Sequence, residues 1–174
     1  VNILMIDVSK SLDFGSSERS KKELMIELYA TIAFSCALNK DRVGVLFFSD
    51  KVERYFEPKS GMKNIWMIAM QLIEWKNESV HSDLLEPLRF LRALKLKRFR
   101  LFLISDFHFE RNKLQKEALV RTMRKNRVYA LNVRDQMESN IPLKGFYQIV
   151  HAETGERSWF NGFSRKKRIS LKTL

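Results

Sequence analysis

Asp7 opens a group of oxygen-bearing side chains whose types suit a hard metal ion. Serines follow it at alternate positions, in the order Asp7, Ser9 and Ser11. Much later in the chain, Ser82 precedes a helical apolar pattern, and Asp106 follows a continuous apolar run. Carboxylate and hydroxyl oxygens, without imidazole or thiolate, suit Mg²⁺ or Mn²⁺ better than zinc. These residue types therefore predict a site for one of those two cations.

The same residues also have a purely structural explanation. Aspartate and serine are common at the tips of loops between strands and helices, because their side chains cap helix N-termini. Ser105, which ends the same apolar run as Asp106, adds one more hydroxyl at that place. Spacing alone leaves both metal binding and capping open.

The elements that must position these residues follow from the hydrophobic periods of the chain. Strand-like and helix-like periods alternate, which predicts an α/β fold with a doubly wound, mostly parallel sheet and helices on both faces. We expect parallel strands at Val1–Ile6, Val43–Phe48, 100–107 and Arg127–Val133, an antiparallel edge strand at Val52–Phe56, a hairpin at 146–160, and helices at Glu23–Leu38, Ile65–Trp75, Leu84–Leu94 and Leu114–Met123. Ser82 and Asp83 are good N-cap residues for the helix at Leu84. In such a sheet, ligands bind beyond the carboxyl ends of the strands, where the predicted ligands fall.

Composition indicates one domain. The chain has 174 residues, 45% of them hydrophobic, which is enough for a substantial core. We predict a domain over residues 1–163 and a basic tail over 164–174. Cys36 is the only cysteine, so neither an internal disulfide nor a thiolate zinc cage is available. The uncharged apolar stretch Leu28–Leu38 is too short to span a membrane. We expect a location on the cytoplasmic side, with any membrane anchor in segments outside this chain.

The order Asp7-x-Ser9-x-Ser11, then a hydroxyl before a helix, then Asp106 resembles the metal-ion-dependent adhesion site of von Willebrand factor A domains. Within these domains, the chain resembles most specifically the bacterial domain-of-unknown-function family fifty-eight, a von Willebrand factor A-like group. The resemblance extends over nearly the whole chain and is carried by the stretches DRVGVLFFSDKVERYFEPKSG, LISDF and RDQMESNIPLKGFYQIVHAETGE. The resemblance implies that Ser9, Ser11 and Ser82 contact a divalent ion directly or through water. It implies that Asp7 and Asp106 supply negative charge.

The resemblance also implies a mode of action. In von Willebrand factor A domains, one open coordination position accepts a carboxylate from a partner protein, so that binding depends on the shared ion. Members of the family are commonly encoded beside MoxR-type AAA+ ATPases, which implies a partner of that kind and an adaptor role. The family usually has threonine where VHSDL places Ser82. Serine lacks the methyl group that restrains the threonine rotamer, so we expect weaker metal binding.

Phosphotransfer is disfavoured by one residue. Haloacid-dehalogenase-like phosphotransferases also place an aspartate after a first buried strand, but they need a second one two residues later as general acid, and this chain has Ser9 there. The adjacent His, Ser and Asp of VHSD cannot converge as a triad, and no glycine-rich phosphate loop is present. We expect His108 at the surface or core edge, Cys36 in the core, and no catalytic activity.

Charge is the second conspicuous feature of the sequence. Lys and Arg number 32 against 20 Asp and Glu, for a formal net charge of +12. The candidate basic surface comprises Arg89, Arg92, Lys95, Lys97, Arg98, Arg100, Arg165, Lys166, Lys167 and Arg168. A solvated helix face and a frayed tail explain these residues without a ligand, and no nucleic-acid module accompanies them. The alternative function is a nucleic-acid- or anionic-membrane-binding module in which the acidic loop is structural.

Overall fold

A computed structural model describes residues 1–10, 20–76, 79, 81–94, 96–108 and 113–134, and the backbone of residues 146–150 and 157–161. The main sheet has the strand order β3-β2-β1-β4-β5. Its strands are β1 (Asn2–Asp7), β2 (Val43–Phe48), β3 (Val52–Lys59), β4 (Arg100–Ser105) and β5 (Arg127–Asn132). β3 runs antiparallel to β2, and the other neighbouring pairs are parallel. A two-stranded antiparallel sheet joins β6 (Phe146–Val150) and β7 (Arg157–Asn161).

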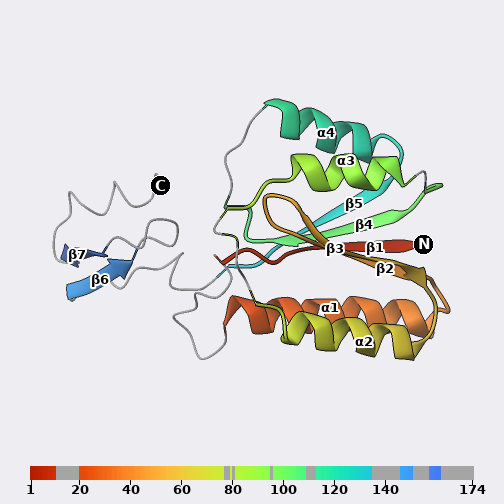
Figure 1. Cartoon of the computed structure of the whole chain (residues 1–174), viewed down its shortest axis with the longest axis horizontal. Helices are drawn as coiled ribbons and strands as arrows, with labels where there is room; N and C mark the ends of the chain where they lie inside the picture. Colours follow the sequence, from red (N-terminus) through yellow and green to blue (C-terminus); the bar gives the residue numbers. More distant parts are fainter. Residues whose placement is uncertain are drawn as a thin grey trace.

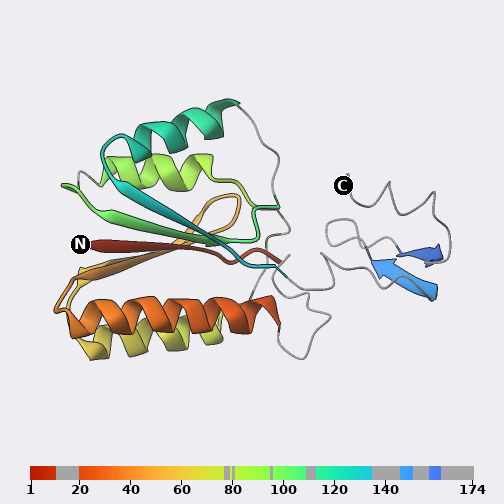
Figure 2. The ribbon, with the colours of Figure 1, turned by 180° about the vertical axis from the view of Figure 1, so that it is seen from behind.

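Helices cover both faces of the main sheet (Figures 1 and 2). The helices are α1 (Lys21–Leu38), α2 (Met62–Ile73), α3 (Leu85–Ala93) and α4 (Lys113–Met123). Alternate residues of β1 enter opposite cores: Leu4 and Ile6 pack on the side of α1 and α2, whereas Ile3 and Met5 pack on the side of α3 and α4. A central strand buried on both faces must be apolar throughout, which is why these strands read as continuous apolar runs. The predicted fold class is confirmed.

Helix α1 begins two residues earlier than the sequence predicts. Ser20 is its N-cap: the Ser20 hydroxyl accepts from the Glu23 N–H, and the Glu23 carboxylate accepts from the Ser20 N–H. Glu23 is therefore the third residue of the helix, where it completes the capping box, and not its start. This shift places Lys21 in the first helical turn.

The prediction that Ser82 caps α3 is wrong. The N-cap is Leu84, and no side chain makes the capping hydrogen bond from that position. Asp83 does serve the helix start, because its carboxylate accepts from the Leu85 N–H at 2.6 Å and from the Gln115 amide at 2.8 Å. The Ser82 hydroxyl is bonded to Asp7 instead, at 2.8 Å. For Ser82, the structural explanation by helix capping is therefore excluded.

The predicted hairpin at 146–160 is confirmed in its two strands, and its turn lies outside the described residues. Residues 164–174 of the predicted basic tail also lie outside them. In the part of the chain that the structure describes, no helix is long and apolar enough to cross a membrane.

Candidate metal site

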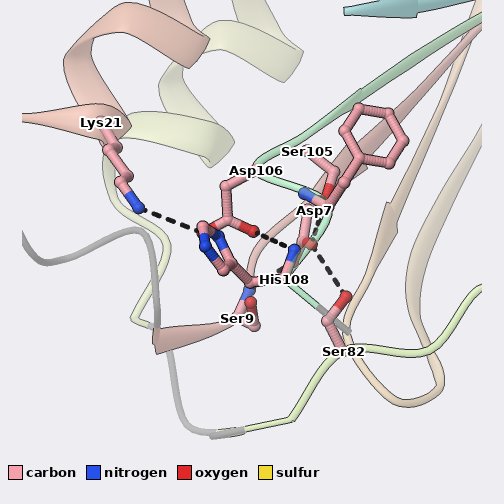
Figure 3. A network of polar contacts seen from close by, with 8 residues as sticks. Asp7, Ser9, Lys21, Ser82, Ser105, Asp106 and His108 are labelled. Carbon is pink, nitrogen blue, oxygen red and sulfur yellow. Dashed lines mark hydrogen bonds and ion pairs between the residues drawn. The ribbon is translucent and has the colours of Figure 1, made fainter. Parts of the chain in front are cut away.

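Asp7 is the centre of a polar cluster at the carboxyl end of β1 (Figure 3). Its side chain is fully buried. Oδ1 accepts from the Ser9 N–H at 3.0 Å, and Oδ2 accepts from the hydroxyls of Ser82 and Ser105, each at 2.8 Å. Three segments that are far apart in the sequence thus meet on one carboxylate. β1 and β4 are parallel neighbours that end at the same edge, which brings Ser105 to Asp7, and the segment before α3 adds Ser82.

Burial dominates the electrostatics of Asp7. It raises the pKa of the Asp7 carboxyl above its ordinary value, and the hydrogen bonds from Ser9, Ser105 and Ser82 only partly oppose it. These three donors are neutral, so none of them offsets the negative charge of the ionised carboxylate. A cation placed beside Asp7 would favour the ionised form.

Unlike Asp7, Asp106 has a positively charged neighbour that stabilises its ionised form. Its side chain is 1% exposed, and Oδ2 lies 3.2 Å from Lys21 Nζ and 3.4 Å from His108 Nδ1. Oδ1 accepts from the His108 N–H at 3.1 Å. Burial alone would raise the pKa of Asp106, but the hydrogen bonds from His108 and the charge of Lys21 outweigh it and lower this pKa to about 2. Asp106 is therefore a permanent anion at neutral pH.

A backbone feature between these residues shapes the edge of the site. Phe107 has a φ of 56°, in the left-handed region that bulky residues rarely adopt. The Phe107 N–H donates to the Ser105 hydroxyl at 2.9 Å, so Ser105 bonds both to Asp7 and to the turn that follows it. The turn brings His108 back over Asp106 with its side chain 57% exposed. His108 is at the surface, as predicted, but it also contacts the site.

The structure brings four of the five predicted ligands, Asp7, Ser9, Ser82 and Asp106, to one edge of the sheet (Figure 3). Ser11, the fifth, lies outside the described residues. Their role as metal ligands stays a prediction.

Besides His108, sequence reasoning left Ser105 and Lys21 out of the site. Ser105 was recognised at the end of its strand but was not counted as a ligand. Lys21 was missed entirely, although its ammonium lies 3.2 Å from Asp106. The S-x-x-E pattern of Ser20 and Glu23 could have placed Lys21 in a first helical turn, but not its contact with a residue 85 positions away.

The donor set fits a hard divalent cation in type. Hydroxyl and carboxylate oxygens are the ligands that Mg²⁺ accepts, usually together with several waters. Within the described ranges, no three His, Cys, Asp or Glu side chains gather in a group that could hold a metal ion. A cation here would therefore depend on serine hydroxyls and water as well as on Asp7 and Asp106. Lys21 adds a positive charge, so its ammonium and the two ionised carboxylates together carry one negative charge instead of two.

Four residues of the predicted basic surface, Arg92, Lys97, Arg98 and Arg100, lie at the other edge of the sheet, where β4 and β5 begin. An open groove of about 1400 Å³ is lined there by eight basic residues and by no acidic one. They are Arg92, Lys97, Arg98, Arg100, Arg121, Arg124, Lys125 and Arg127. Arg89 is not among them and pairs with Glu86 at 2.6 Å on an exposed helix face. Lys95, Arg165, Lys166, Lys167 and Arg168 lie outside the described residues.

Solved structures share this fold at low sequence identity. An aerotolerance-related membrane protein from Bacteroides fragilis NCTC 9343 is 13% identical, with 92% of this chain and 81% of that chain covered and a TM-score of 0.62. Conserved hypothetical protein BatB from Bacteroides thetaiotaomicron is 15% identical, with 90% and 73% covered and a TM-score of 0.60. Proximal thread matrix protein 1 from the mussel byssus, in a structure with a zinc-occupied MIDAS motif, is 14% identical, with a TM-score of 0.55. This last alignment covers 74% of this chain but only 36% of the mussel chain.

No curated protein matches the sequence. The structural neighbours and the strand order confirm the predicted von Willebrand factor A-like fold. The model of the family described as "Protein of unknown function DUF58" matches residues 1–173, and the chain therefore belongs to that family.

Proposed function

We propose that this domain is a divalent-metal-dependent protein-interaction module, and that a carboxylate of its partner completes the coordination of a Mg²⁺ or Mn²⁺ ion. The observation that carries the proposal is the convergence of two hydroxyls on one oxygen: Ser82 and Ser105 both donate to Asp7 Oδ2. This arrangement gathers oxygen donors at the edge of the sheet where ligands of open α/β folds bind.

The predicted ligands would hold the ion in two ways, by neutral coordination and by negative charge. Ser9, Ser11 and Ser82 would supply neutral hydroxyl oxygens, and Asp7 and Asp106 would supply charge. The bound cation would attract an anionic side chain of the partner and make the interaction conditional on metal. The zinc-occupied MIDAS motif of the mussel protein supports the proposal by fold analogy. We propose no catalytic role, because Ser9 stands where a phosphotransferase needs an acidic general acid.

The partner is proposed by its chemistry and by the family resemblance. It must present an exposed carboxylate, and the resemblance favours a MoxR-type AAA+ ATPase, with this domain as the adaptor. A Bacteroides neighbour is described as a membrane protein, which supports anchoring of the full-length protein through segments outside this chain. The adaptor would then work on the cytoplasmic side of that membrane.

Metal binding and partner capture are tested separately. Calorimetric titration with Mn²⁺ and Mg²⁺ should show one site in the wild-type chain and a weaker one in Ser82→Ala. The matched control is Asp41→Asn, because Asp41 pairs with Arg100 at the opposite edge of the sheet, at 2.6 Å. Pull-down of a MoxR-type ATPase should succeed with Mg²⁺ and fail with EDTA. Capture that chelator leaves unchanged would show that the metal bridge is wrong.

A second candidate function rests on the basic groove at the other edge of the sheet. The lining holds eight cationic side chains and no acidic one, although Arg100 pairs with Asp41 and Arg121 with Glu117 outside it. The remaining positive charge favours binding of a polyanion, with nucleic acid as the simplest probe. Retention of the chain on duplex DNA should then fall steeply as salt is raised and should not respond to EDTA. Equal retention at low and high salt would exclude this function.

A further inference from the structure

We propose that Lys21 competes with the divalent cation. Its ammonium neutralises part of the negative charge that would otherwise attract the ion, and so weakens metal binding in the free domain. This inference rests on the proposed function and assigns its regulation to one residue.

Geometry places the ammonium of Lys21 against Asp106, one of the predicted ligands (Figure 3). Nζ lies 3.2 Å from Asp106 Oδ2, and the two side chains are only 4% and 1% exposed. Lysine is almost never buried to this extent unless its charge is paired. The capping box of Ser20 and Glu23 fixes the first turn of α1, so the base of the lysine side chain is held where it can reach Asp106.

Charge explains why this pair would oppose a metal ion. Asp7 and Asp106 could together balance a divalent cation, but Lys21 already balances one of these charges. A bound cation would share Asp106 with the ammonium, and the two positive charges would repel each other in surroundings that screen charge less than water does. The ammonium therefore raises the free energy of the metal-bound domain relative to the metal-free one.

The pair would also couple the metal to the partner. A partner carboxylate brings one further negative charge, which offsets the ammonium and favours the cation at the same time. Metal and partner would then bind more tightly together than either does alone, and such coupling is reciprocal. In the metal-free domain, the ion pair of Lys21 with Asp106 would keep the affinity for the cation low.

Lys21→Met tests the inference, with Lys22→Met as the matched control. Lys22 is the next residue of the same helical turn, but its ammonium donates to the Trp75 carbonyl at 2.7 Å, away from Asp106. Free Mn²⁺ is measured by electron paramagnetic resonance during titration of each chain. Lys21→Met should bind Mn²⁺ at least about tenfold more tightly than the wild type. Lys22→Met and the charge-keeping Lys21→Arg should bind like the wild type.

Each outcome bears on a different statement. Equal or weaker Mn²⁺ binding by Lys21→Met, beside measurable binding by the wild type, would overturn the role of Lys21 and leave the proposed metal site standing. Binding by Lys21→Met alone would support the competition and overturn metal dependence of the native chain. No binding by either chain would overturn both proposals. If Lys21→Met fails to fold because Asp106 loses its partner, Lys21→Gln keeps a hydrogen-bond donor without the charge and gives the same test.

Discussion

Asp106→Asn should destabilise the metal-free domain, because Asp106 is held as an anion by its partners. The pKa of Asp106 is lowered from 3.8 to about 2. Each pKa unit corresponds to roughly 1.4 kcal/mol, so ionised Asp106 contributes about 2 kcal/mol to the free energy of unfolding at pH 7. The substitution removes this contribution and also leaves the buried Lys21 ammonium without a carboxylate. We therefore expect a loss of at least about 2 kcal/mol at pH 7.

The pH dependence of this loss has a definite sign. A carboxyl whose pKa is lower in the folded than in the unfolded chain stabilises the fold above its unfolded pKa, and this stabilisation disappears as pH falls through the folded pKa. For Asp106 the window extends from about pH 4 down to about pH 2. The part of the loss that comes from ionised Asp106 should therefore fall to roughly half at pH 3.

Urea unfolding in EDTA, at pH 7 and pH 3, measures this prediction. Asp7→Asn is the matched control in the same site, because burial raises the pKa of Asp7 and its ionised form therefore disfavours the fold at neutral pH. The asparagine carbonyl can still accept from Ser82 and Ser105, whereas the Ser9 N–H loses its acceptor. Removal of the disfavoured charge offsets that loss, so we expect a stability within about 1 kcal/mol of the wild type. A loss for Asp106→Asn below about 0.5 kcal/mol at pH 7, or the same loss at both pH values, would refute the reasoning.

Three further results are expected. Ser82→Thr should tighten Mn²⁺ binding by less than about 1 kcal/mol in calorimetric titration, because threonine has less rotamer freedom to lose; weaker binding would show that its methyl group clashes. Millimolar Mg²⁺ should raise the melting temperature of the wild-type chain by linkage, and calorimetry that detects no shift and no heat would contradict the metal site. Tyr29→Phe should lower the free energy of unfolding by about 1 kcal/mol or more in urea, because the buried Tyr29 hydroxyl donates to the Ile65 carbonyl at 2.9 Å; unchanged stability would mean that this bond between α1 and α2 contributes nothing.

The alternation of strand-like and helix-like hydrophobic periods in the sequence was enough to predict the fold class. Val43–Phe48 was predicted with the bounds that the structure has, since a strand buried on both faces must be apolar along its whole length. Helix starts were less accurate. Apolar period shows which residues face the core, whereas the start of α1 is set by hydrogen bonds between Ser20 and Glu23.

The sequence by itself indicated most of the oxygen-bearing side chains of the candidate site, though not Ser105 or Lys21. Asp7, Ser9, Ser82 and Asp106 were named from residue type, from their expected places at strand ends or before a helix, and from the resemblance to von Willebrand factor A domains. Only the tertiary structure decided what these side chains bond to. The Ser82 hydroxyl donates to Asp7 and does not cap α3, and Lys21 pairs with Asp106, which lies 85 positions away in the sequence. Both contacts form between segments distant in the chain, and local pattern carries no information about which long side chain a buried carboxylate will meet.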